Sequence, residues 1–513
     1  MKLNFNEENI SEDQKIKPQG GMEGKIVISS YLPSVQKRHI KRKTNLDQVM
    51  KELQEKHNHS WIEDILIRNK DNLNGPALYY RGTTISYEEM FENIIRVSKA
   101  LIKMGVKQED EVPMCVSNCP EMLYFLGALN LIGAKVNIFG ADFDKEYIRE
   151  IVSSCNSNLL IATDDKYEEI KDILTGTNKD NKVIISLTDS LKDGKDPFAS
   201  YDDRFYKFMN KVGKFQKEDN TILSFREFLI KANNYKGPLL TPKVQLEDEF
   251  IITYTSGSTK NGRPKAIVHT NSSLITMARF HDTDLSGLPE MRNIVGLAHI
   301  PPHSNTDLIT SISDVLSQTC TVALEPIYDK DFFAYSLLIN RPSFAPATRS
   351  FWIQGIKDFQ EKEEFQGMKL PFLLIPASVG EATSLGEEKF INKGLRKLKA
   401  GSDKLPIITA PLSMGGGDCE HGGLFFKLYK ALYDKISLSK EGHGLTPFQL
   451  TELAVLREDG TECKYGEYGR LVSTSPCTMK RYKDNPKATE EFFITDIYGR
   501  TWGDNNVRGY IDT

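Results

Sequence analysis

The sequence predicts an α/β fold made of several subdomains, and three observations support this prediction. The length of 513 residues suits two or three subdomains better than one hydrophobic core. From about residue 60, apolar runs of strand length alternate with amphipathic helical patterns. A loop rich in glycine and hydroxyl residues lies between two further apolar runs near residue 260. Strands and helices that alternate in this way favour parallel pairing with right-handed crossovers.

The N-terminal half shows the alternation most clearly. Ser86 begins a capping box for a long helix, and Gly105 ends that helix. Asn118 is expected to cap a second helix that ends at Gly133. The remaining helices are expected at about residues 144–154, 224–232 and 272–280. Strands are expected at residues 77–80, 111–116, 135–139 and 159–162.

The chain divides into four predicted segments. Residues 1–58 form an extension, whose basic run is either a solvated connector or a contact for RNA or a phosphate ligand. We expect a first α/β subdomain at residues 59–245, including a charged surface excursion at 188–246. The second α/β subdomain, at 246–425, begins with the glycine-rich loop, and a smaller β-rich, barrel-like subdomain follows at 426–513.

Composition indicates a soluble cytoplasmic protein. A net charge of -4 gives no general attraction to nucleic acid or to anionic membranes. The seven cysteines form no C-x-x-C pair, and we interpret them as reduced thiols. The sequence predicts neither a signal peptide nor a membrane span, because no apolar run is long enough. The oligomeric state is left open between monomer and dimer.

The glycine-rich loop at residues 254–266 has the chemistry to wrap a polyphosphate. Glycines let successive N–H groups point into one concavity, while hydroxyls add donors and lysines add charge. A polar hairpin turn between two strands is the alternative. Gly257 and Gly262 have the spacing of a Walker A loop, but Arg263 and Pro264 stand where lysine and serine or threonine are required. These residues disfavour an ordinary P-loop kinase or GTPase.

The loop resembles the phosphate-binding signature of the adenylate-forming superfamily, which includes acyl-CoA synthetases, luciferases and the adenylation domains of peptide synthetases. The match covers residues 254–259 and 262–266, with Lys260 and Asn261 as extra residues. It extends from about residue 60 to 513 and implies the large domain of an acyl-CoA synthetase-like enzyme. The resemblance also implies a small C-terminal domain, which we expect to be absent from these 513 residues. Because that domain supplies a lysine, we expect the chain alone to adenylate very slowly.

The resemblance assigns roles to several residues. Lys265 and Glu420 are the expected catalytic residues, and Glu420 is the expected ligand of Mg²⁺, with Asp418 as the alternative carboxylate. Asp504 is expected to accept hydrogen bonds from the ribose, although a turn aspartate is the alternative. The full set of expected ATP-binding residues is Thr255, Ser256, Gly257, Ser258, Thr259, Lys265, Gly380, Glu381 and Asp504.

The expected substrate pocket departs from the family pattern at several positions. His303 either lines the acyl pocket or is only a loop residue, and Asp307 either pairs with a substrate amine or caps a helix. No tyrosine precedes the glycines at 415–417, which could be only a flexible turn, and Cys419 replaces a threonine. The expected pocket residues are His303, Asp307, Ala347, Ser378, Val379, Gly380, Met414, Gly415 and Gly416.

The predicted function is ATP-dependent activation of a small carboxylic acid to an acyl-adenylate, with release of pyrophosphate. ATP and Mg²⁺ are the expected cofactors, and CoA is the expected acceptor in the full enzyme. Amino-acid adenylation for a carrier protein is the first alternative. A nucleotide-binding pseudoenzyme is the second alternative, because of the departures near Glu420.

Overall fold

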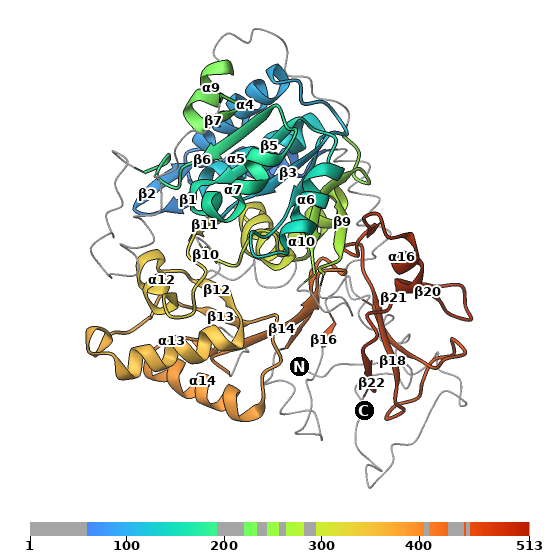
Figure 1. The fold of residues 1–513 in the computed structure, drawn as a ribbon. Helices are drawn as coiled ribbons and strands as arrows, with labels where there is room; N and C mark the ends of the chain where they lie inside the picture. The colour runs from blue at the N-terminus through green and yellow to red at the C-terminus, as the bar shows by residue number, and fades with distance from the viewer. Residues whose placement is uncertain are drawn as a thin grey trace.

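Three β-sheets with their flanking helices form the α/β fold that the sequence predicts (Figure 1). The structure is a computed structural model. It describes residues 59–191, 220–232, 244–255, 263–281, 294–404, 410–428, 446–447 and 452–511. The predicted extension at 1–58, most of the charged excursion and the tip of the glycine-rich loop at 256–262 lie outside the described residues. No described helix has the length and apolar character needed to cross a bilayer.

The first sheet has eight strands in the order β19-β9-β8-β4-β3-β5-β6-β7. The strands from β8 to β7 pair in parallel, whereas β9 and β19 pair antiparallel. Their bounds are β3 Glu111–Cys115, β4 Lys135–Ile138, β5 Leu159–Thr163, β6 Asn181–Ile185, β7 Ile222–Ser224, β8 Glu249–Tyr254, β9 Ala266–Thr270 and β19 Arg481–Tyr482.

Helices cover both faces of this sheet, so its strands are apolar on both sides. Leu159 and Ile161 of β5 belong to one buried cluster, and Leu160 and Ala162 belong to another on the opposite face. This is the two-residue alternation of a strand that is buried twice. The first cluster includes α4 and α5, and the second includes α6 and α7. The helix bounds are α4 Tyr87–Lys103, α5 Pro120–Ile132, α6 Lys145–Ser154, α7 Tyr167–Gly176 and α9 Phe225–Ala232.

The second sheet has nine strands in the order β16-β15-β14-β13-β12-β10-β11-β1-β2. Its interior is parallel, and β2, β15 and β16 add antiparallel edges. The glycines at 415–417 lie within β14 and therefore form no flexible turn. The strand bounds are β1 Pro76–Tyr80, β2 Thr83–Ser86, β10 Val295–Ala298, β11 Thr321–Leu324, β12 Phe344–Ala347, β13 Ile375–Ser378, β14 Ser413–Asp418, β15 Gly423–Leu428 and β16 Thr446–Pro447.

One large hydrophobic core joins the two sheets. It contains Val136 and Ile161 of the first sheet together with Leu78 and Val322 of the second. Helices also cover the other face of the second sheet, where Trp352 is almost fully buried. Further helix bounds are α3 Trp61–Arg68, α10 Asn271–His281, the π-helix Thr306–Ser313, α11 Asp314–Ser317, α12 Phe333–Asn340, α13 Arg349–Glu361 and α14 Leu385–Lys397.

The third sheet is small and antiparallel, and it is drawn in red in Figure 1. It corresponds to the β-rich part that the sequence predicts, although its described strands form no closed barrel. The bounds are β17 Glu452–Leu456, β18 Gly469–Thr474, β20 Phe493–Thr495, β21 Thr501–Gly503 and β22 Arg508–Gly509, with helix α16 at Pro486–Phe492. The predicted segment boundaries remain predictions.

The predicted cap of α5 is wrong. The N-cap position of α5 is Cys119, which makes no side-chain cap, and Pro120 opens the helix. The Asn118 amide instead donates to the carbonyl of Ile300 at 2.9 Å. Asn118 therefore ties the start of α5 to the loop after β10, a contact that local sequence could not reveal.

Helix α6 is capped by a side chain, which gives a test of the fold. Asp144 accepts a hydrogen bond from the Tyr147 N–H at 3.0 Å. We expect Asp144→Ala to lower the free energy of unfolding by about 1 kcal/mol, because it leaves a helix donor unsatisfied. Asp144→Ser keeps an acceptor at this position and should recover most of the loss in denaturant titrations. Equal stability of Asp144→Ala and the unmodified chain would contradict the cap.

Candidate active site

A cleft of 1990 Å³ opens where the three sheets meet. Its lining includes Cys115 and Tyr254 from the first sheet, Ser378 and Met414 from the second, and Val472 from the third. Cys115, Tyr254 and Ser378 are the last residues of parallel strands, and Met414 lies in β14, which pairs in parallel with β13. Open α/β sheets commonly bind ligands at that edge. The cleft is therefore the candidate active site.

The described ends of the glycine-rich loop close on each other at this edge. The Thr255 N–H donates to the Lys265 carbonyl at 3.0 Å, and the Lys265 N–H donates to the Thr255 hydroxyl at 2.9 Å. Pro264 is held to helix α6, since its carbonyl accepts from the Tyr147 hydroxyl at 2.8 Å. Between these anchors, the expected phosphate contacts of Ser256, Gly257, Ser258 and Thr259 lie outside the described residues.

Lys265, Glu420 and Tyr482 meet at the base of the loop. The Lys265 Nζ donates to the Tyr482 hydroxyl at 2.5 Å, and that hydroxyl donates to Glu420 Oε1 at 2.7 Å. The Lys265 Nζ also lies 3.4 Å from Glu420 Oε1 and 4.1 Å from the centre of the Tyr482 ring. Burial and the neighbouring Glu420 raise the pKa of Tyr482, so its hydroxyl stays protonated. The sequence predicted the lysine and the glutamate but missed the tyrosine.

Asp418 is occupied by other partners. Its Oδ1 accepts from the backbone and Nδ1 of His421 at 2.8 Å and 2.7 Å, and its Oδ2 accepts from Asn505 at 2.5 Å. Burial lowers the pKa of His421, but Asp418 and Glu420 raise it by more, so the net shift is upward. His421 is also 2.7 Å from the Ser473 hydroxyl. Asp418 therefore links β14 to the third sheet.

Three buried polar side chains, those of Asn305, His269 and Thr253, support the turn that carries Glu420. The carbonyl of Cys419 accepts from Asn305 at 2.8 Å and lies 2.9 Å from His269 Nε2. The Thr253 hydroxyl in turn donates to Asn305 Oδ1 at 2.5 Å. Burial lowers the pKa of His269 to about 4, which keeps the ring neutral. Sequence reasoning missed these residues, and polar side chains inside otherwise apolar strands were the only available signal.

The expected nucleotide contacts fall on two sides of the cleft. Ser378 ends β13, and Val379, Gly380 and Glu381 follow it; all four line the cleft. Gly380 has a φ of 76°, which glycine adopts without strain. Glu381 also accepts from the backbone of Ser350 at 3.1 Å. Met414 and Gly415 of β14 complete this wall.

Asp504 lies in the cleft but already has two partners. Its Oδ2 accepts from Arg470 Nε at 2.7 Å, and its Oδ1 accepts from the Asn506 N–H at 2.7 Å. Each carboxylate oxygen can accept more than one hydrogen bond, so Asp504 keeps acceptor capacity for a ribose.

Aromatic rings form the remaining wall. Phe143 packs edge-to-face against His303 and Tyr254, with centroid distances of 5.5 Å and 5.2 Å. Burial lowers the pKa of His303 to about 4, so the ring is neutral. His303 lines the cleft. This wall offers rings without positive charge.

The sequence matches the AMP-binding enzyme family over residues 68–483, which is most of the chain. The chain belongs to this family. It is 27% identical over 206 residues to an acetyl-coenzyme A synthetase of Brucella canis, and the match covers 39% of this chain but only 28% of that relative. The predicted membership of the adenylate-forming group is confirmed.

Solved structures agree with this assignment at the level of the fold. A long-chain-fatty-acid-CoA ligase from Archaeoglobus fulgidus is similar with a TM-score of 0.67 at 16% identity, covering 88% of this chain and 82% of that chain. An inhibitor-bound N-terminal domain of a Mycobacterium tuberculosis protein gives a TM-score of 0.65 at 17% identity, covering 88% of this chain and 97% of that chain. These structures support the predicted large-domain architecture.

Glu420 fits the Mg²⁺ ligand expected in an AMP-binding enzyme better than Asp418 does. Mg²⁺ prefers carboxylate oxygen and usually shares its shell with substrate phosphates and water. Glu420 lines the cleft, and among the described residues only its Oε1 has partners. Both oxygens of Asp418 are hydrogen-bonded. The described residues contain no group of three or more metal-ligating side chains, so phosphate and water would complete such a site.

Two predicted pocket residues, Ala347 and Asp307, do not line the cleft in the described structure. Ala347 lies within β12, and the surroundings of Gly416 in β14 lie outside what the structure describes. Asp307 is fully buried inside the π-helix, and neither of its carboxylate oxygens has a hydrogen-bond partner among the described residues. The capping alternative is wrong, because the N-cap position is Asn305. Burial raises the pKa of Asp307 to about 8, while Ser311 and Asn118 lower it by less.

The buried Asp307 predicts a specific dependence of stability on pH. In the unfolded chain its carboxyl loses its proton near pH 4, whereas in the folded chain it keeps that proton up to about pH 8. Stability should therefore fall as the pH rises from about 4 to about 8 and then level off. Asp307→Asn removes this loss, so its melting temperature should gain on the unmodified chain across that range. Parallel pH profiles would contradict a carboxyl that stays protonated.

The two candidate Mg²⁺ ligands, Asp418 and Glu420, can be separated by mutation. Glu420→Gln should raise the Mg²⁺ concentration needed for half-maximal ATP binding, because a neutral amide is a weaker ligand. Asp418→Asn should instead lower the melting temperature, since it weakens the pair with His421. Calorimetric ATP titrations at a series of Mg²⁺ concentrations measure the first effect. If only Asp418→Asn shifts the Mg²⁺ requirement, the metal carboxylate lies two residues earlier.

Proposed function

We propose that this chain binds ATP with Mg²⁺ and forms the large domain of an enzyme that activates a carboxylic acid. The product is an acyl-adenylate, and pyrophosphate is released. The observation that carries the proposal is the meeting of Lys265 and Glu420 at the closed base of the glycine-rich loop. Membership of the AMP-binding enzyme family supports it.

The reaction joins a carboxylate oxygen to the α-phosphorus of ATP and breaks the bond to the β-phosphate oxygen. Negative charge gathers on the departing pyrophosphate. Lys265 supplies a positive charge at the loop, and bound Mg²⁺ supplies further neutralisation of the phosphates. Asp504 and the backbone after β13 would orient the nucleoside, so that the α-phosphate faces the acid.

The substrate is proposed to be a carboxylic acid without an α-amine. The rings of Phe143, Tyr254 and His303 form the wall of the predicted acyl site and carry no negative charge, and Asp142 is a carboxylate that lines the cleft beside His303. Such a wall suits an aromatic or apolar acyl group. Acyl transfer to the thiol of CoA is the proposed second step, by analogy with the acetyl-coenzyme A synthetase that matches part of the chain.

Asp307 favours a second candidate function. Burial makes the Asp307 carboxyl costly to ionise, and a cationic amine beside it would offset that cost. Amino-acid adenylation for a carrier protein is therefore the alternative. Asp307 lies behind the lining of the cleft rather than in it, so this candidate requires the π-helix to turn its side chain toward the substrate.

Carboxylate-dependent exchange between ATP and pyrophosphate tests the proposal. We expect an acid from a panel of aromatic and aliphatic carboxylic acids to support exchange in the intact enzyme, and Lys265→Ala to reduce it on the order of a hundredfold. The same variant should weaken ATP binding in calorimetry. Lys393→Ala, an exposed lysine on α14, is the matched control.

Two outcomes would redirect the proposal. Unchanged ATP affinity in Lys265→Ala would remove this lysine from the phosphate site. Exchange that depends on an amino acid and disappears in Asp307→Ala would favour the carrier-protein alternative instead.

A further inference from the structure

Strand β19 brings Tyr482 into the site from a distant part of the chain. It pairs antiparallel with β9, which starts directly after Lys265. On either side of it, the N–H groups of Lys480 and Lys483 donate to carbonyls of β9 at 2.9 Å each. The main chain of this short strand is thus fixed at both ends, next to the exit of the glycine-rich loop.

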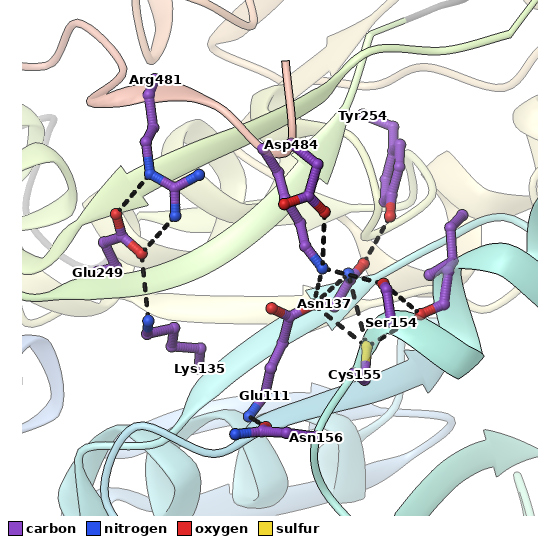
Figure 2. A network of polar contacts seen from close by, with 12 residues as sticks. Glu111, Lys135, Asn137, Ser154, Cys155, Asn156, Glu249, Tyr254, Arg481 and Asp484 are labelled. Carbon is purple, nitrogen blue, oxygen red and sulfur yellow. Dashed lines mark hydrogen bonds and ion pairs between the residues drawn. The ribbon is translucent and has the colours of Figure 1, made fainter. Parts of the chain in front are cut away.

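Two cationic side chains anchor β19 to the first sheet. Arg481 makes a two-pronged contact with Glu249 of β8, at 2.8 Å and 2.9 Å. Glu249 also pairs with Lys135 of β4 at 3.2 Å, as Figure 2 shows. A guanidinium that meets both oxygens of a carboxylate fixes orientation as well as distance. Arg481 therefore sets the position of the strand across β9 and β8.

The second anchor reaches the entrance of the loop. Lys483 donates to Glu111 of β3 at 2.6 Å, and Asn137 of β4 donates to the same oxygen at 2.8 Å. The other end of the Asn137 amide accepts from the Tyr254 hydroxyl at 2.7 Å (Figure 2). Tyr254 is the last residue of β8, so one polar network ties β19 to the strand that enters the loop.

Arg481 and Lys483 are two residues apart, and Tyr482 points to the opposite side of the strand, toward Lys265 and Glu420. A neutral tyrosine hydroxyl has one donor and spare acceptor capacity. The Tyr482 hydroxyl donates to Glu420 Oε1 and accepts from Lys265 Nζ, so it uses one hydrogen-bond donor of the ammonium and one acceptor of the carboxylate. Among the described residues, the remaining Lys265 donors and Glu420 Oε2 have no further partner, so they stay available for a ligand.

Lys265 and Glu420 are close enough to neutralise each other, with 3.4 Å between Nζ and Oε1. A direct, relaxed pair would direct the ammonium away from phosphate and compete with Mg²⁺ for the carboxylate. The hydroxyl between them holds each group in a fixed direction. The buried aromatic ring of Tyr482 lies against the ammonium and limits its movement.

We propose that Tyr482 is a positioning residue that keeps Lys265 directed at phosphate and Glu420 directed at Mg²⁺, with Arg481 and Lys483 holding its strand in place. This inference rests on the proposed function, because it assumes that ATP and Mg²⁺ bind here. Tyr482 acts through its two neighbours.

Tyr482→Phe tests the hydroxyl while it keeps the ring. In calorimetric ATP titrations across a Mg²⁺ series, we expect the variant to need roughly tenfold more Mg²⁺ for half-maximal ATP binding, the effect of losing about one charge-assisted hydrogen bond. Tyr468→Phe makes the same chemical change at a side chain that is 68% exposed, and should behave as the unmodified chain. If Tyr482→Phe lowers only the melting temperature and leaves the Mg²⁺ dependence unchanged, the positioning role is wrong.

A second measurement needs no nucleotide. The melting temperatures of Tyr482→Phe, Glu420→Gln and the double variant form a cycle in the free protein. A bridging hydroxyl predicts that the two single effects do not add, whereas additive effects overturn the bridge. Absence of ATP binding by the unmodified chain would reject the proposed function, and the cycle would still decide whether Tyr482 couples to Glu420.

Discussion

The pairing of β19 with β9 is the contact on which the arrangement of the site depends. Lys265, Glu420 and Tyr482 come from three separate parts of the sequence, and the pairing brings the third to the other two. Two residues of strand give few main-chain hydrogen bonds. Ion pairs on one side of β19 and a tyrosine hydroxyl on the other add to them. The ion pairs therefore hold β19 in a position that its few main-chain hydrogen bonds alone would secure only weakly.

Local signals in the sequence predicted most elements of the first sheet. Helix α4 begins after Ser86 and ends just before Gly105, because caps and glycine stops act over a single turn. The order of strands within a sheet is a different problem. Strands β1 and β2 come first in the described chain, yet they lie at the edge of the nine-stranded sheet beside β11. Apolar strands resemble one another, so nothing local distinguishes these partners.

The residues of the site show the same difference between local motifs, which the sequence reveals, and long-range contacts, which it does not. Motif resemblance placed Lys265, Glu420 and Asp504 in the sequence, and the structure places all three around one cleft. It could not reveal that Arg470 contacts Asp504 or that Asn505 donates to Asp418, because the partners lie 34 and 87 residues apart in the sequence. Asn118 shows the same limit in the fold. Its side chain suits a helix cap, but a distant carbonyl competes for it more successfully.

The distance along the chain between the loop and β19 has a consequence for synthesis. Lys265 and Tyr482 are 217 positions apart, so the ribosome releases β9 long before β19 emerges. During that interval β9 is the outermost strand of its sheet, with unpaired N–H and C=O groups that other chains can join. Pairings of such large sequence separation also form slowly. A nascent chain halted before residue 480 would thus carry a nearly complete first sheet whose edge strand β9 is exposed and prone to aggregation. A chaperone that binds this edge would prevent such aggregation.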